Sequence, residues 1–80
     1  MNKTQIANLE KLLRRLTLEK RAYESAATSH LYVAQLFAKK SIERKSLEDA
    51  SQDAFAWAAE IALQIAETRN KLEAAQIALN

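Results

Sequence analysis

The chain has 80 residues and a formal net charge of +2, and it contains no glycine, no proline and no cysteine. The lack of cysteine excludes disulfides and thiolate metal sites and suits a reducing compartment, so we expect a cytoplasmic protein. The lack of glycine removes phosphate-cradling loops and the turn residue that strand-rich folds need. Sixteen alanines and many other strong helix formers predict a single all-α domain over residues 1–80.

No segment reads as a signal peptide or a membrane span. Residues 1–13 are interrupted by polar side chains before a long apolar region can form. The most apolar run, DAFAWAAEIALQIAE at residues 53–67, contains Glu60 and Gln64. It falls short of the ~20 apolar residues that cross a bilayer. We therefore expect no membrane span.

A heptad pattern predicts a first helix over residues 3–42. Apolar positions recur at alternating spacings of three and four, which is the repeat of a helix that packs on another helix. Lys20 interrupts the pattern. It either sets the register or packs its stem while its ammonium reaches solvent. The pattern, here called the first seam, consists of Ile6, Leu9, Leu13, Leu16, Lys20, Tyr23, Ala27, His30, Ala34 and Phe37.

We expect the turn at residues 41–46. Ser46 followed by Glu48 and Asp49 is typical of a helix start, with a capping hydroxyl and acids in the first turn. Cations suit the end of the preceding helix. Those in this region are Lys39, Lys40, Arg44 and Lys45.

The second predicted helix covers residues 47–79. Its polar residues, from Asp53 to Lys71, fall on one narrow stripe, so the helix needs cover on more than one side. Alanines recur every four residues from Ala50 to Ala66, which either permits a close helix contact or reflects helix propensity alone. The second seam is predicted as Leu47, Ala50, Ala54, Trp57, Ile61, Ile65, Thr68, Leu72, Ala75 and Leu79.

The expected architecture is a long antiparallel helical hairpin that forms a four-helix bundle on dimerisation. Two helices of roughly 55 Å, at 1.5 Å per residue, are too thin to enclose a core of their own. The alternative is a compact three-helix monomer with helices near 4–26, 29–44 and 47–79, which would need Ser29 as an N-cap.

Charge is divided between the two halves. Residues 1–45 carry a net charge of +6 and residues 46–80 carry −4. One interpretation is that a basic helix and an acidic helix pair antiparallel through flanking charges. The other is a nucleic-acid-binding face. That face would contain Lys11, Arg14, Arg15, Arg21, Lys39, Lys40, Arg44 and Lys45.

The sequence offers little for catalysis or metal binding. His30 is the single histidine, and the residue three before it is Ala27, so the Glu-x-x-His pattern of di-iron bundles is missing. We expect Asp53, Glu60 and Glu67 to be solvated surface residues rather than acid–base catalysts. We therefore predict a non-enzymatic protein with no metal and no cofactor.

Protein binding through helix surfaces is the favoured function, in a regulator, an inhibitor or a secretion-chaperone-like adaptor. In its proportions the chain resembles the helical-hairpin cochaperones of bacterial type III secretion. The expected dimer resembles in architecture the helical-hairpin homodimers that bind RNA, such as plasmid copy-number regulators. The candidate protein-binding residues are Leu31, Tyr32, Leu36, Phe55, Trp57, Ala59 and Leu63. The expected partner is a second copy, another protein or both, with nucleic acid as the alternative.

Overall fold

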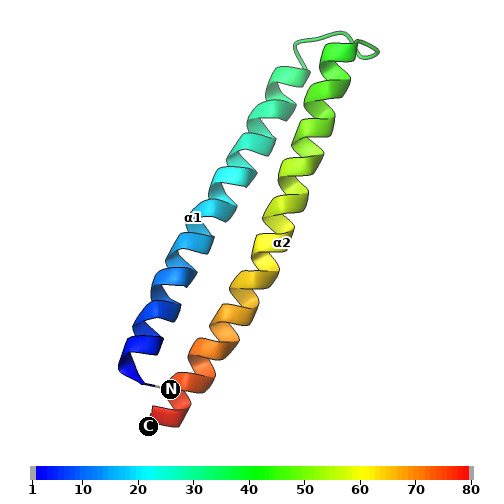
Figure 1. Ribbon diagram of the computed structural model, residues 1–80. Helices are drawn as coiled ribbons and strands as arrows, with labels where there is room; N and C mark the ends of the chain where they lie inside the picture. Colours follow the sequence, from blue (N-terminus) through cyan, green and yellow to red (C-terminus); the bar gives the residue numbers. More distant parts are fainter. Residues whose placement is uncertain (1, 80) are drawn as a thin grey trace.

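The computed structural model describes residues 2–79, which form an antiparallel pair of long helices (Figure 1). Helix α1 spans Lys3–Ala34 and helix α2 spans Ile42–Leu79, and no strand is present among the described residues. The two ends of the chain lie together and the turn lies at the opposite end (Figure 1). The molecule measures 59 × 14 × 12 Å. The predicted all-α hairpin is confirmed.

Helix α1 begins with a reciprocal cap and runs without a break. The Asn2 side chain accepts a hydrogen bond from the Gln5 backbone N–H at 2.9 Å, and the Gln5 side chain accepts one from the Asn2 N–H at 2.8 Å. Thr28 keeps its hydroxyl within the helix by donating to the Glu24 carbonyl at 2.9 Å. The three-helix alternative, which needs a break near Ser29, is therefore wrong.

The turn lies at residues 35–41, earlier than the predicted 41–46. Helix α1 ends at Ala34 rather than near residue 42. Two short-range bonds follow its last turn, from the Leu36 N–H to the Val33 carbonyl at 3.0 Å and from the Phe37 N–H to the Ala34 carbonyl at 3.1 Å. No residue described by the structure has a positive φ, so the chain reverses without the conformation that favours glycine.

Ser41, and not Ser46, caps helix α2. The Ser41 hydroxyl oxygen accepts a hydrogen bond from the Arg44 N–H at 3.2 Å, and the Ser41 carbonyl accepts one from the Lys45 N–H at 3.2 Å. The hydroxyl of Ser41 also donates to the Ala38 carbonyl at 2.8 Å, which ties the cap to the turn. The basic residues expected at the end of the first helix therefore lie in the turn and in the first turn of α2.

The contact between the helices has two distinct parts. Toward the chain ends, Leu16, Ile61 and Ile65 form a cluster of large buried side chains, with Leu12 and Leu13 packed beside it. Toward the turn, the buried positions carry only small side chains. They are Ala27, Ala34, Ser51, Ala54 and Ala58.

The small side chains allow a direct contact from a side chain of one helix to the backbone of the other. The Ser51 side chain is 1% exposed, and its hydroxyl donates to the Ala27 carbonyl at 2.9 Å. A hydroxyl on so short a side chain can reach that carbonyl only where the two backbones approach closely. In this part of the hairpin, the helices are therefore held together by the close packing of small side chains and one hydrogen bond, rather than by the burial of large apolar groups.

The first seam is correct along most of α1, although Phe37 lies beyond the end of that helix. The second seam differs from the prediction at three positions, one of which is Leu79, which is exposed. Ser51 and Ala58 are buried where Ala50 and Trp57 were expected, and Trp57 is 58% exposed. An indole in the seam would hold the helices apart, whereas serine and alanine let them approach. The alanines that recur every four residues do not all lie on one face of α2, because one helical turn takes only 3.6 residues. Ala54 and Ala58 are buried, whereas Ala66 is exposed.

Among the residues that the structure describes, ion pairs lie within the helices and not between them. Within residues 2–79 they join Arg15 to Glu19 at 3.5 Å, Lys20 to Glu24 at 2.9 Å and Arg44 to Glu48 at 3.4 Å, each at a spacing of four. The prediction that flanking charges pair the basic helix with the acidic helix therefore has no support from ion pairs within residues 2–79. The packing of the seam sets the pairing.

The cap can be tested by comparing two serines. Ser41→Ala removes the oxygen that accepts the Arg44 N–H, so we expect it to lower the free energy of unfolding by about 1 kcal/mol. Ser46→Ala changes an exposed residue inside α2 and should fall within about 0.5 kcal/mol of the parent protein. Urea unfolding at one fixed protein concentration measures both. A larger loss for Ser46→Ala would contradict the assigned start of α2.

The close approach can be tested at Ser51. Ser51→Ala removes one hydrogen bond and should cost about 1 kcal/mol. Ser51→Leu adds volume where the helices nearly touch and should cost about 1–3 kcal/mol. Ala66→Leu, at an exposed position of the same helix, is the matched control and should leave the unfolding midpoint nearly unchanged. A Ser51→Leu variant as stable as the parent would show that the helices are not closely packed here.

Candidate protein-binding surface

The hairpin exposes more surface than its mass requires. Its accessible surface is 6089 Å², whereas a compact protein of 9.0 kDa exposes about 4,900 Å². Many large apolar side chains are exposed, among them Leu36 at 74% exposure. Single exposed apolar residues are ordinary, but groups of them mark binding surfaces.

One flank of the hairpin is marked by an aromatic pair. The rings of Tyr23 and Trp57 stack with their centroids 6.5 Å apart and their planes 23° from parallel. Tyr23 was predicted in the seam, but it is 39% exposed, because the contact passes through small neighbours such as Ala27. Heptad positions next to the seam place further residues on this flank. We call the flank the Trp57 side, and its apolar residues include Leu12, Tyr23, Ala26, Val33, Ala50 and Trp57.

The opposite flank, here the Phe55 side, combines apolar and basic residues. Helix α2 contributes a row with spacings of four, three and four, made of Phe55, Ala59, Ala62 and Ala66. Both helices contribute arginines to a shallow groove of about 360 Å³ on this flank. The groove is lined by Leu13, Arg14, Thr17, Leu18, Arg21 and Arg69.

All seven residues predicted for protein binding are exposed, but they do not form one patch. Trp57 lies on one flank, while Phe55, Ala59 and Leu31 lie by their heptad positions on the other. Leu36 lies in the turn, just beyond α1. Tyr32 and Leu63 occupy the outward positions of their helices. Sequence reasoning missed Tyr23, whose place on the surface follows from its stacking on Trp57.

The eight residues predicted for a nucleic-acid face are also divided. Arg15 and Arg44 are each paired with a glutamate, and Lys11 lies on an outward position of α1. Arg14 and Arg21 share the groove with Arg69, a residue of the acidic half that the sequence did not single out. The remaining cations, Lys39, Lys40 and Lys45, lie at the turn. The pairing of the helices, rather than any local motif, brings Arg69 to the groove.

The two polar residues of the first seam, Lys20 and His30, are both partly exposed. The Lys20 ammonium donates to the Glu24 carboxylate at 2.9 Å, and its side chain is partly exposed, so the stem packs while the charge is paired at the surface. His30 is partly buried beside the small-residue part of the seam. Within residues 2–79, no group of three or more His, Asp or Glu side chains is arranged to hold a metal ion.

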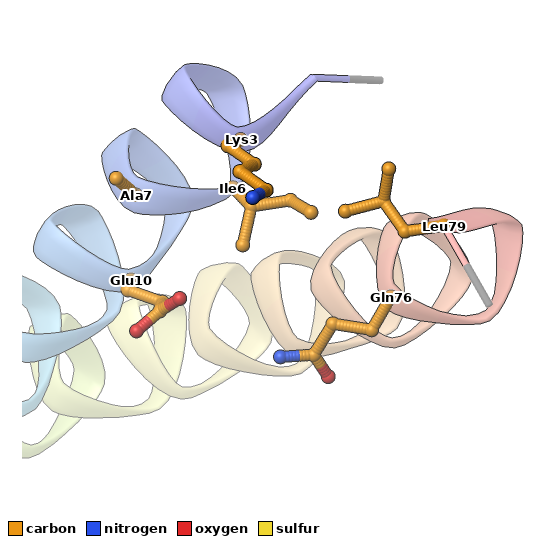
Figure 2. Close-up of a pocket in the computed structure, with 6 residues that line it drawn as sticks. All are labelled: Lys3, Ile6, Ala7, Glu10, Gln76 and Leu79. Atoms are coloured by element: carbon orange, nitrogen blue, oxygen red, sulfur yellow. The ribbon is translucent and has the colours of Figure 1, made fainter.

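A larger hollow lies at the end of the hairpin where the chain begins and ends. It has a volume of about 530 Å³ and is lined by Lys3, Ile6, Ala7, Glu10, Gln76 and Leu79. Figure 2 shows Ile6 and Leu79 pointing toward each other across it, with the polar side chains around them. Ile6 and Leu79 give the hollow an apolar contact across it. No helix among the described residues combines the length and apolarity needed to cross a bilayer.

Comparisons with protein-family models, curated proteins and solved structures find no match to this chain.

Proposed function

We propose that the protein is a non-enzymatic binding module that presents helix surface to another protein. The observation that carries this proposal is the exposed Tyr23–Trp57 pair beside a seam of small residues. Tryptophan and tyrosine contribute strongly to protein interfaces, because they bury a large area with few rotatable bonds. A regulator, an inhibitor or a secretion-chaperone-like adaptor would act in this stoichiometric way.

A second copy of the chain is the simplest partner in this proposal. Two copies that merged into a compact body of twice the mass would expose about 8,000 Å² in total. Relative to two separate hairpins of 6089 Å² each, about 4,000 Å² is then available for burial. Obligate homodimers bury about 2,000–5,000 Å². A four-helix bundle dimer would therefore bury the excess surface that the single hairpin exposes.

Nucleic-acid binding is the second candidate, and the groove on the Phe55 side supports it. Arg14, Arg21 and Arg69 line this groove together, and no carboxylate lines it. None of the three forms an ion pair within residues 2–79, although Glu10 and Glu73 lie four residues from Arg14 and Arg69. Guanidinium groups bind phosphate well because they offer several donors in one plane.

Self-association can be tested at Trp57. We expect the parent protein to sediment at twice the mass of the chain at micromolar concentration. Trp57→Glu places a charge on the Trp57 side and should yield a monomer. Asn70→Glu adds the same charge at an outward position of α2 and should leave the dimer intact. Circular dichroism must show helical content in all three proteins. A parent protein that stays monomeric up to about 100 μM would contradict the dimer, because an obligate interface of this size binds far more tightly.

The nucleic-acid candidate can be tested on heparin and on mixed RNA. If it holds, the parent protein is retained at physiological salt and elutes steeply with added salt, since phosphate contacts release counterions. Arg14→Gln combined with Arg69→Gln should then elute at lower salt than the parent. The control, Arg15→Gln combined with Arg44→Gln, removes equal charge outside the groove. No salt-dependent retention of the parent protein eliminates this candidate.

A further inference from the structure

We infer that the second copy packs on the Trp57 side with both turns at the same end of the bundle, so that each α1 lies against the partner's α2. This inference rests on the proposed self-association and specifies its geometry. It concerns which flank is covered and which helices become neighbours.

A symmetric pair of hairpins has two ways to form an antiparallel four-helix bundle. If the turns lie at the same end, α1 of one copy neighbours α2 of the other. If the turns lie at opposite ends, α1 neighbours the partner's α1 and α2 neighbours the partner's α2. Both arrangements can cover the same flank of each hairpin, so we compare them by charge and local fit.

The net charges of the helices favour the same-end arrangement. Helix α1 carries six Lys/Arg and three Glu, a net charge of +3, and α2 carries four Lys/Arg and seven Asp/Glu, a net charge of −3. Opposite-end packing would place helices of like charge side by side, whereas same-end packing places opposite charges together. No ion pair within residues 2–79 joins the helices of one hairpin, so this complementarity is still available to a partner.

The acidic residues next to Trp57 also favour the same-end arrangement over the opposite-end arrangement. Asp53, Glu60 and Glu67 recur every seven residues and form one row on this flank, with a repeat of about 10.5 Å. In the opposite-end arrangement two such rows would face each other. In the same-end arrangement each row faces the partner's α1.

The register of the hairpin sets which charges would meet. The Ser51–Ala27 hydrogen bond fixes the relative height of the helices. Counting from it along both helices puts Glu67 level with Lys11 and puts Arg15 between Glu60 and Glu67. A twofold axis along the bundle preserves these heights, so the partner's Arg15 would approach this acidic row, while Lys11, on its outward position, would stay outside the contact. Glu19, the acid of α1 closest to this contact, is already held by Arg15 at 3.5 Å.

The shape of the Trp57 side also fits this arrangement. In the same register, Trp57 lies level with Arg21, next to Ala22 and about 7.5 Å along the helix axis from Ala26. The partner's Ala22 and Ala26 would leave room for the indole, which no side chain of its own hairpin covers fully. Large residues that enter spaces beside alanines are typical of packed helix interfaces.

The Phe55 side is a poor surface for a symmetric contact. Arg14, Arg21 and Arg69 lie together on it, and a twofold axis would bring six guanidinium groups into one interface. Their groove has no carboxylate in its lining to offset this charge. The α2 row from Phe55 to Ala66 could pair with its own copy, but only by placing the arginines of the two α1 helices near each other.

Distances between spin labels test the orientation of the two copies. The chain has no cysteine, so Lys40→Cys in the turn and Thr4→Cys near the chain ends each provide one labelling site per copy. Same-end packing predicts label-to-label distances below about 35 Å for both variants, because neighbouring helix axes lie ~8–10 Å apart. Opposite-end packing predicts distances close to the 59 Å length for both. Two long distances in a protein of dimeric mass would overturn the inference and leave the proposed self-association intact. A monomeric mass would instead overturn the self-association.

A pair of alanine variants tests which flank is covered. Ala26→Glu on the Trp57 side should weaken dimerisation at least tenfold in sedimentation equilibrium. Ala59→Glu on the Phe55 side should change the dimer dissociation constant by less than about threefold. Both positions are exposed in the single hairpin, so circular dichroism should show both variants folded. Loss of the dimer with Ala59→Glu, and its retention with Ala26→Glu, would assign the interface to the Phe55 side and overturn the inference.

Discussion

The close approach of the two helices near the turn determines most of what is distinctive in this protein. The Ser51 hydroxyl on α2 reaches a backbone carbonyl of α1, at Ala27. The buried positions around it carry alanine, including Ala34, Ala54 and Ala58. Larger side chains would separate the helices and break the hydrogen bond. The seam therefore excludes the large apolar residues that this part of the sequence contains.

The exclusion of large residues from the seam also leaves them on the surface that we propose for binding. Tyr23 and Trp57 stack beside the seam rather than in it, and Phe55 lies on the other flank. A single hairpin has no third helix to cover them, as the 14 Å and 12 Å widths of the molecule show. The same small side chains that hold the hairpin together thus leave its aromatic residues exposed. Fold and proposed function share one physical cause.

The sequence was sufficient for the hairpin and for most of the first seam, because spacings of three and four report helix packing directly, although Tyr23 lies beside that seam and Phe37 beyond α1. It was insufficient for the second seam. There, Ala50 and Trp57 fit the heptad spacing as well as their neighbours Ser51 and Ala58 do. A hydrophobicity pattern favours tryptophan, whereas close packing selects for small volume. The predicted position of the turn was wrong for a related reason. Ser46 has the stronger local cap signal, but a cap stabilises a helix by only about 1 kcal/mol. The packing of whole helices outweighs that contribution. Arg69 could not be placed in the groove without the register of α1 against α2.

The division of charge has a different meaning once the ion pairs are known. The three ion pairs within residues 2–79 are local, at spacings of four, and such pairs contribute only about 0.3–0.5 kcal/mol each. They cannot specify how two long helices pair, which the sizes of the seam residues already do. In the proposed dimer, the opposite net charges of α1 and α2 would act between the two copies. The two possible arrangements of that dimer differ in which helices become neighbours, and long-range charge is the term that we propose separates them.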